Sequence, residues 1–243
     1  MTVSFIIPAY NEEHSIARTL GSIAEAARAL GEPHEIIVAD DGSTDRTGAV
    51  AEAHGARVIR VRHRHIAATR NSGARAATGD RFIFVDADTQ VTAALVRAAL
   101  AAMSEGAIGG GCAVKFDDPL PRYARVIEWL LDDSFRHAKL AAGCFLFCTR
   151  EGFGAAGGFD ESVYGGEEIL MSQALKRHGR FVVLRELALT SGRKLRAYSG
   201  AEVFQTLMYL LANGRKSVES RAGLDFWYAP RREDPLASPV PPD

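Results

Sequence analysis

The sequence contains few cysteines and no excess of positive charge, and each absence excludes a class of protein. Its three cysteines, Cys112, Cys144 and Cys148, are odd in number and lack the spacing of a disulfide scaffold. We expect Cys144 and Cys148 on one strand, where four residues span roughly 13 Å, which is too far for a disulfide. A formal net charge of -1 provides no global basic field to attract nucleic acid. The composition therefore predicts a reducing, cytoplasmic setting and no nucleic-acid partner.

Long apolar runs and a leader pattern are missing too. The chain has no stretch of about 18 apolar residues, so we expect no membrane-spanning helix. Residues 1–5 enter a predicted strand directly, without the basic region and apolar stretch of a signal peptide. These absences also favour a cytoplasmic protein.

Two common phosphate-binding loops are absent. A dinucleotide-binding domain needs G-x-G-x-x-G after its first strand, whereas this chain has Ala-Tyr-Asn-Glu at residues 9–12. The P-loop pattern G-x-x-x-x-G-K-[ST] does not occur, and the three glycines at 109–111 enter a predicted strand rather than a helix. A diphosphate bound here would be held by a cation rather than by a glycine-rich loop.

The first half of the chain contains a regular alternation of strand and helix patterns. Apolar runs predict strands at residues 3–8, 35–39, 57–61 and 82–85, with Pro8 expected to end the first. Helices are predicted between them, and a basic segment at 62–65 leads into the third. This alternation predicts an α/β fold: a doubly wound, mostly parallel sheet flanked by helices, in a single domain. Ligands bind such sheets beyond the carboxyl ends of the strands.

The second half is less regular. Its predicted elements are a helix carrying Leu95, Val96, Leu100 and Met103, a strand at 108–116, a helix with the face Tyr123, Val126, Ile127, Leu130 and Leu131, a strand at 144–148, a turn at 157–161, a helix at 167–177, a strand at 181–184, a helix at 203–211 and a disordered tail from Glu233.

Acidic side chains follow the predicted strands of the first half. Asp86 and Asp88 flank one alanine directly after a buried strand, and they project together if the strand geometry continues. Two close carboxylates attract a hard divalent cation, which suits Mg²⁺ or Mn²⁺ with a diphosphate. Tyr10, Asp40 and Asp41 lie past the ends of other strands at the same edge. The alternative interpretation is a set of polar turns that cap core strands.

Several motifs, in order, resemble family 2 glycosyltransferases. They are Phe-Ile-Ile-Pro-Ala-Tyr-Asn-Glu at 5–12, Val-Ala-Asp-Asp-Gly-Ser-Thr-Asp at 38–45, Arg-Asn-Ser-Gly at 70–73, Val-Asp-Ala-Asp at 85–88, and Gly-Gly-Phe-Asp-Glu at 157–161 with Gly-Glu-Glu at 166–168. The resemblance covers roughly residues 3 to 180. It implies a GT-A fold, a nucleotide-diphosphate-sugar donor, Mg²⁺ or Mn²⁺, and inversion at the anomeric carbon.

The resemblance also implies roles for individual residues. It implies nucleotide-sugar binding by Pro8, Tyr10, Glu12, Asp41, Arg70 and Asp86, with Asp41 on the base and Asp86 on ribose or metal. Asp88 is implied as the direct metal ligand. A carboxylate can accept from uracil or from guanine, so Asp41 leaves the choice between UDP- and GDP-sugars open. A plain turn for Asp41, a solvated helix charge for Arg70 and a packed loop aromatic for Tyr10 are the alternatives.

A pair of glutamates is implied as the catalytic centre. Glu168 matches the position of the family's base, and Glu167 is the alternative base. Leu170 stands where the family often has a further acid, which departs from the pattern. A carboxylate at this place can remove an acceptor proton if it reaches the hydroxyl. The other interpretation is two exposed acids at a helix N-terminus.

Two further features bear on the substrate. The Gln-x-x-Arg-Trp motif of processive synthases is absent, which favours non-processive transfer. Arg193 and Lys194 lie on a predicted flexible loop and are expected to close over the donor diphosphate. A solvated basic loop is the alternative.

The sequence thus predicts a metal-dependent inverting glycosyltransferase that moves a sugar from a UDP- or GDP-sugar to an acceptor hydroxyl. The alternatives are a sugar nucleotidyltransferase and a non-catalytic nucleotide-sugar-binding protein. The acceptor stays open between a glycan, a lipid-linked molecule and a small molecule. The expected domain covers 1–232, with a nucleotide-binding half at 1–90, an acceptor and catalytic half at 91–198 and a C-terminal helical segment at 199–232; residues 233–243 form the tail.

The C-terminal segment combines an apolar helix with cations and aromatic residues. Its apolar residues are Val203, Phe204, Leu207, Met208, Leu210 and Leu211, beside Tyr209. Arg215, Lys216 and Arg221 follow, and then the aromatic run 226–228. We expect this helix to close the core over the sheet, with peripheral contact at the inner face of the membrane and a homodimer contact as the alternatives.

Overall fold

The computed structural model describes residues 1–243 except 118, 127, 129–137, 230–231, 233 and 236–243. Its elements are β1 (Val3–Ala9), α1 (Ile16–Leu30), β2 (His34–Asp40), α2 (Thr47–Ala53), β3 (Arg57–Arg60), α3 (Ile66–Ala76), β4 (Arg81–Val85), β5 (Thr89–Gln90), α4 (Ala93–Ser104), β6 (Ala107–Phe116), β7 (Phe145–Thr149), α6 (Arg150–Ala156), α7 (Glu167–His178), β8 (Arg180–Thr190), α8 (Arg193–Ala197), α9 (Gly200–Asn213), η1 (Gly214–Val218) and α10 (Asp225–Tyr228).

The strands form one mixed, mostly parallel sheet in the order β3-β2-β1-β4-β7-β6-β8-β5. β1 pairs in parallel with both β2 and β4, and β2 pairs in parallel with β3. β7 runs antiparallel between β4 and β6, and β6 pairs in parallel with β8. The predicted doubly wound α/β fold is confirmed. The predicted helix at Tyr123–Leu131 is described only in part, since Ile127, Leu130 and Leu131 lie outside the described residues.

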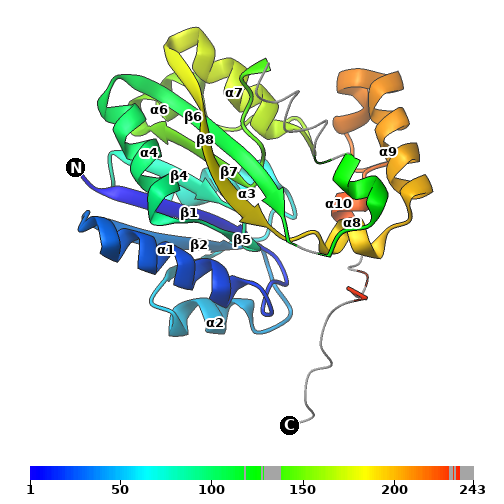
Figure 1. The fold of residues 1–243 in the computed structure, drawn as a ribbon, viewed down its shortest axis with the longest axis horizontal. Helices are drawn as coiled ribbons and strands as arrows, with labels where there is room; N and C mark the ends of the chain where they lie inside the picture. Colours follow the sequence, from blue (N-terminus) through cyan, green and yellow to red (C-terminus); the bar gives the residue numbers. More distant parts are fainter. Residues whose placement is uncertain (118, 127, 129–137, 230–231, 233, 236–243) are drawn as a thin grey trace.

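Helices cover both faces of the sheet, as Figure 1 shows. α1, α2 and α4 pack on one face and α3, α6 and α7 on the other, each with its own apolar core. Strand β4 supplies both cores, because Ile83 and Val85 point to one face while Phe82 and Phe84 point to the other. Burial on both faces explains why this strand reads as a continuous apolar run.

Strand β1 continues through Pro8, so the prediction that this proline ends the strand is wrong. β1 pairs with β4 only as far as Ile6, opposite Phe84, whereas its pairing with β2 continues to Ala9, opposite Asp40. At Pro8, β1 is therefore paired with β2 but not with β4. A residue without a backbone N–H is tolerated there because one edge of the strand makes no ladder hydrogen bonds.

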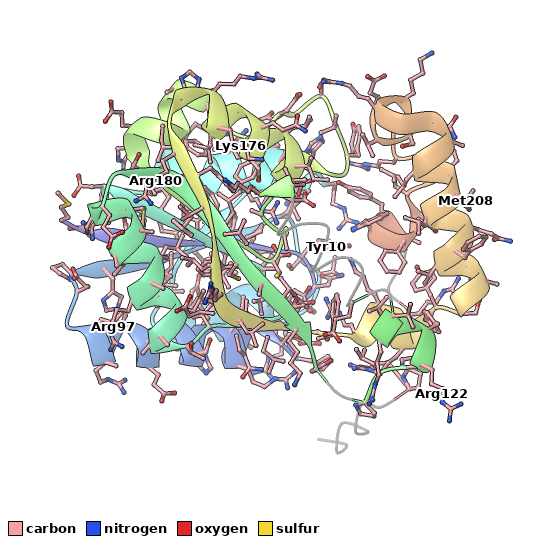
Figure 2. All side chains as sticks on the ribbon, turned by 45° about the horizontal axis from the view of Figure 1, so that its top comes forward. Tyr10, Arg97, Arg122, Lys176, Arg180 and Met208 are labelled. Atoms are coloured by element: carbon pink, nitrogen blue, oxygen red, sulfur yellow. The ribbon has the colours of Figure 1, made fainter. Side chains whose placement is uncertain are left out.

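The C-terminal helix α9 stands beside the sheet rather than over it (Figure 1). Phe204 is 62% exposed and Met208 is 46% exposed. Figure 2 shows Met208 on α9, away from the sheet. The expectation that α9 closes the core is therefore wrong for this face of the helix. The chain afterwards contacts the loop before α7: Leu224 is buried, and the Tyr164 N–H donates to the Val218 carbonyl at 2.6 Å. No helix among the described residues is long and apolar enough to cross a bilayer.

Candidate active site

The acids after β4 lie in a tight turn. The Thr89 N–H donates to the Asp86 carbonyl at 3.0 Å, so the chain turns directly after the strand. Strand alternation therefore does not set the directions of Asp86 and Asp88, contrary to the sequence expectation. Each carboxylate instead meets a different arginine: Asp86 Oδ1 lies 2.8 Å from Arg70 Nη2, and Asp88 Oδ2 lies 3.1 Å from Arg193 Nη2.

Arg70 joins several of the predicted site residues. It sits in α3, is 1% exposed, and donates from Nη1 to Glu167 Oε1 at 2.5 Å and from Nη2 to Asp86 and to the Gly143 carbonyl, both at 2.8 Å. Burial by itself lowers the pKa of this guanidinium, but Asp86, Glu167 and Glu168 raise the pKa above its ordinary value. The alternative of a solvated helix charge is wrong. Arg70 is a buried cation that fixes the acids around it.

The two glutamates at the start of α7 have different surroundings. Glu167 is buried and paired with Arg70, whereas Glu168 is partly exposed. Burial, and then the charge of Glu167, raise the pKa of Glu168 to about 8, against the opposing effect of Arg70. A Cβ at Gly143 would lie 3.5 Å from the Glu168 Cδ, so the glycine leaves room beside this carboxylate. Glu168 thus has the proton affinity and access that a base near neutral pH needs, and Glu167 positions Arg70.

Arg193 reaches across the sheet edge to acids from the first half of the chain. Its Nη1 lies 2.7 Å from Glu12 Oε2 and its Nη2 lies 2.5 Å from Glu12 Oε1, in a bidentate pair, while Nη2 also contacts Asp88. The predicted flexible loop is the short helix α8, and a solvated basic loop is wrong for Arg193, which is 21% exposed at its side chain. Lys194 differs, because its Nζ lies 5.7 Å from the Phe226 ring centroid.

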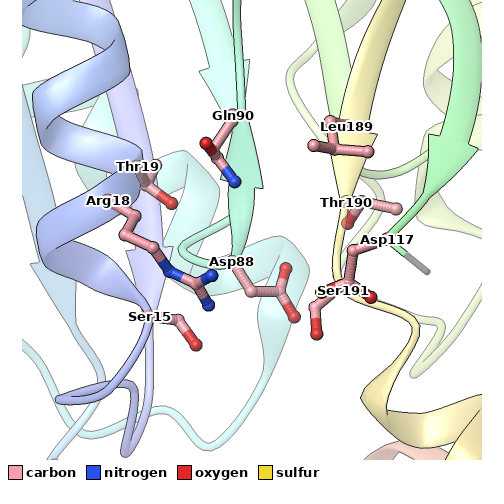
Figure 3. A pocket seen from close by; sticks show the side chains of 9 residues that line it. All are labelled: Ser15, Arg18, Thr19, Asp88, Gln90, Asp117, Leu189, Thr190 and Ser191. Atoms are coloured by element: carbon pink, nitrogen blue, oxygen red, sulfur yellow. The ribbon is translucent and has the colours of Figure 1, made fainter. Parts of the chain in front are cut away.

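A small pocket opens beside Asp88. Figure 3 shows the Asp88 carboxylate between Arg18 of α1 and Ser191 after β8. The remaining lining residues are Ser15, Thr19, Gln90, Asp117, Leu189 and Thr190. Burial, and then Glu12, raise the pKa of Asp88 to about 6, with Arg193 acting in the opposite direction. This carboxylate lies where additional positive charge is favourable.

Asp41 holds the basic segment after β3. Its Oδ1 accepts from the N–H groups of His63 and Arg64 at 2.6 and 2.8 Å, and its Oδ2 accepts from the His65 N–H and the Thr69 hydroxyl at 3.1 and 2.9 Å. These four bonds use the four acceptor positions of a carboxylate. The predicted contact between Asp41 and a base stays a prediction, and it requires one of these bonds to be exchanged.

Arg64 covers the aromatic residue expected near the nucleotide. Its guanidinium carbon lies 3.3 Å from the centroid of the Tyr10 ring, and Figure 2 shows Tyr10 between the sheet and α9 in that view. No role for Arg64 is predicted from the sequence, although the run of basic residues at 62–65 is an available signal. Pro8 lies buried in β1, near the start of the loop that carries Tyr10.

Asn71 is a second residue whose contacts are not predicted from the sequence. Its side chain donates to the Phe159 carbonyl at 2.9 Å and to Glu161 Oε1 at 2.8 Å, and accepts from the Phe159 N–H at 2.9 Å. The motif at 70–73 is thereby joined to the turn at 157–161, which precedes the glutamate pair. The adjacency of Asn71 to Arg70 was the only signal.

The acids fit a divalent cation that is completed by a substrate. Among the described residues, no group of three or more His, Cys, Asp or Glu side chains is placed to hold a metal ion. Mg²⁺ typically uses one or two carboxylates together with waters and substrate phosphates, and Asp88 with Asp86 supplies that set. The donor chemistry therefore fits Mg²⁺ or Mn²⁺ bound together with a diphosphate.

The sequence pattern of Glycosyl transferase family 2 matches residues 4–154. One curated relative, the validoxylamine A glucosyltransferase of Streptomyces hygroscopicus subsp. jinggangensis (strain 5008), is 29% identical over 220 residues, which covers 73% of this chain and 52% of that protein. The chain thus spans about half the length of this relative.

Solved structures share the fold at low identity. The mannosyltransferase PcManGT of Pyrobaculum calidifontis, in complex with GDP-Man and Mn²⁺, superposes with a TM-score of 0.66 at 18% identity, over 85% of this chain and 60% of that chain. Residues 1–349 of S. aureus TarS, in complex with UDP-GlcNAc, superpose with a TM-score of 0.62 at 20% identity, over 94% of this chain and 71% of that chain.

Proposed function

The chain belongs to glycosyl transferase family 2, and we propose that it transfers a sugar from a UDP- or GDP-sugar to an acceptor hydroxyl, non-processively and with inversion. One observation carries the proposal: the buried Arg70 ties Asp86 of the predicted metal pair to Glu167, beside the proposed base Glu168. One buried cation thereby holds the proposed donor-binding acid and the neighbour of the proposed base, which supports a role in positioning the two reactants.

Donor binding is proposed at the carboxyl ends of β1, β2 and β4. Asp88, with Asp86, would hold Mg²⁺ or Mn²⁺, which would neutralise the charge that grows on the leaving nucleoside diphosphate. Arg193 and Lys194 would bind the diphosphate oxygens, and Tyr10 with Pro8 and Glu12 would border the nucleotide. Complexes of structural neighbours with GDP-Man and Mn²⁺ and with UDP-GlcNAc support a nucleotide-sugar donor and leave the base open.

The proposed reaction is a single displacement. Glu168 accepts the proton of the acceptor hydroxyl, and the acceptor oxygen forms a bond to the anomeric carbon on the face opposite the diphosphate. The bond between this carbon and the diphosphate oxygen breaks, and its electron pair leaves with the nucleoside diphosphate. The raised pKa of Glu168, about 8, gives the carboxylate the basicity for this step near neutral pH.

Product analysis tests the proposal against its rivals. Incubation with UDP- and GDP-sugars, Mn²⁺ and a panel of acceptor hydroxyls should release free nucleoside diphosphate. A sugar nucleotidyltransferase would release pyrophosphate from a nucleoside triphosphate and a sugar phosphate instead. Saturable donor binding without release under every acceptor condition would favour a non-catalytic nucleotide-sugar-binding protein. The Glu168→Gln variant is the control, because it should bind the donor and release far less product.

A further inference from the structure

Arg193 occupies the space between two acids that the proposed function assigns to donor binding. Its guanidinium forms a bidentate pair with Glu12 and also contacts Asp88 Oδ2 at 3.1 Å. Glu12 and Asp88 are 8% and 17% exposed at their side chains, so the pair is mostly shielded from water. Water therefore screens these charges only weakly.

The charges that face this point come from several elements. Glu12, Asp86 and Asp88 bring negative charge from the loops after β1 and β4, and Lys194 of α8 adds a second cation close enough to act on Asp88. Arg18 of α1 lines the pocket beside Asp88 and is exposed. Arg193 contacts both Glu12 and Asp88, so its removal would take away positive charge that offsets these two shielded acids.

We infer that in the donor-free protein the Arg193 guanidinium takes the place of the divalent cation beside Asp88, and that a diphosphate draws it away so that metal and donor bind together. This inference rests on the proposed function. Phosphate oxygens form charge-assisted bonds with guanidinium in the same fork geometry as a carboxylate, so a diphosphate can replace Glu12 as the partner of Arg193. The vacated Asp88 then faces the metal.

The backbone around Arg193 confines this change to the side chain. The Gly192 N–H donates to Asp117 Oδ1 at 2.6 Å, and a Cβ at Gly192 would lie 2.5 Å from the Leu120 Cδ2. The Glu12 N–H is likewise held by the Thr47 hydroxyl at 2.7 Å. Because both backbones are anchored, rotation of the Arg193 side chain is the movement that can exchange its partners.

This arrangement predicts opposite effects of one substitution on two ligands. Arg193→Gln should tighten Mn²⁺ binding in the absence of nucleotide by about tenfold or more, because a cation no longer competes for Asp88. The same variant should weaken the binding of UDP or GDP in Mn²⁺, because the diphosphate loses a partner. In the wild-type protein, Mn²⁺ alone should bind weakly, and the added nucleoside diphosphate should strengthen it, since the coupling between two ligands is reciprocal.

The test is titration of the full chain with Mn²⁺, with free Mn²⁺ measured by electron paramagnetic resonance, without nucleotide and with UDP or GDP. Arg18→Gln is the matched control: it removes one exposed positive charge that lines the pocket beside Asp88, and it should change Mn²⁺ affinity by less than about twofold. Circular dichroism and thermal unfolding establish that each variant is folded. If Arg193→Gln does not fold, Arg193→Lys serves, since lysine keeps the charge but not the bidentate pair and should give a smaller change in the same directions.

The outcomes separate this inference from the proposed function. Tighter Mn²⁺ binding by folded Arg193→Gln, with weaker nucleotide binding and an unchanged Arg18→Gln, supports the inference. Unchanged or weaker Mn²⁺ binding by Arg193→Gln, in a protein whose wild type binds nucleotide with Mn²⁺, overturns it and leaves the proposed function intact. Absence of Mn²⁺ binding in every variant, with and without nucleotide, overturns both the inference and the metal dependence.

Discussion

At the scale of single residues, the two neighbouring glutamates of α7 have different environments and therefore different proposed roles. Glu167 is buried against Arg70, whereas Glu168 is partly exposed and has a raised pKa. Glu168→Gln should therefore bind the donor as the wild type does and lose turnover by roughly 10²–10⁴-fold. Calorimetry and steady-state rates measure the two effects.

Glu167→Gln is the comparison variant for this prediction. It removes a buried charge partner of Arg70, so it should lower the free energy of unfolding as well as activity. If Glu167→Gln keeps wild-type stability and loses more turnover than Glu168→Gln, the base is Glu167 and the assignment is wrong.

The pH dependence follows from the same residue. A base must be ionised, so kcat/KM should rise with pH up to about 8, the pKa of Glu168 in the folded protein. Stability should change in the opposite direction. Between the ordinary value of 4.5 and about 8 the folded state binds more protons than the unfolded state, so this group lowers the free energy of unfolding as pH rises. Chemical denaturation at several pH values across this window measures the free energy of unfolding. This free energy should fall less steeply with pH in Glu168→Gln than in the wild type, and an identical pH dependence would contradict the raised pKa.

At the scale of elements, the position of α3 on the sheet sets the position of Arg70. A Cβ at Gly73 would lie 2.5 Å from the Cγ2 of Ile6, a buried residue of β1. Gly73→Ala should therefore push the helix from the strand, cost about 1–3 kcal/mol of stability and lower activity through Arg70. Chemical denaturation and donor turnover measure both effects.

Gly21 of α1 provides the matched control for Gly73. A Cβ there meets nothing within 4 Å, so Gly21→Ala should leave activity unchanged and stabilise the protein by up to about 1 kcal/mol. Equal changes in the free energy of unfolding for Gly73→Ala and Gly21→Ala would mean that the close contact between α3 and β1 does not determine the effect of the added methyl group.

The elements were predictable from local pattern, and the pairing of charges was not. Apolar runs and helical spacing located β1, β2, β4 and α1 because burial on one or two faces imposes a period on the sequence. The motifs also identified Arg70, Asp86, Asp88, Glu167 and Glu168 as candidate site residues. The hydrogen bond between Arg193 and Glu12 joins residues that are 181 positions apart in the sequence. A local sequence pattern cannot predict a contact between residues so far apart in the chain. Strand alternation left two interpretations of Asp86 and Asp88 open, a shared direction or a polar turn, because it says nothing about where the strand stops; the structure has the turn.

At the scale of the whole molecule, α9 presents an apolar face outside the core. Phe204, Leu207 and Met208 are 62%, 43% and 46% exposed, and the exposed Arg215 and Lys216 follow in η1. An apolar helix face with nearby cations suits contact with an anionic membrane surface. We expect weak binding to vesicles that contain anionic lipid, weaker still at high salt, as sedimentation would show.

Two variants separate the contributions to this vesicle binding. Phe204→Ser should remove most of it, whereas Glu128→Gln, a change of charge outside α9, should have little effect. Tight co-sedimentation that persists at high salt would mean that the helix is a strong anchor and would favour a lipid-linked acceptor. Concentration-dependent dimerisation that Phe204→Ser abolishes would assign the face to a homodimer instead.

We propose that Asp88 holds a cation which binds a nucleoside diphosphate at the edge of the sheet. The decisive measurement is isothermal titration calorimetry of the wild type and of Asp88→Asn with UDP and with GDP, in Mn²⁺ and in EDTA. Because Asp88 is shielded and its pKa is raised to about 6, Asp88→Asn should stay folded. We predict that one nucleotide binds the wild type in Mn²⁺ and that binding is lost in EDTA and in Asp88→Asn. Equal affinity in all three conditions would contradict the claim.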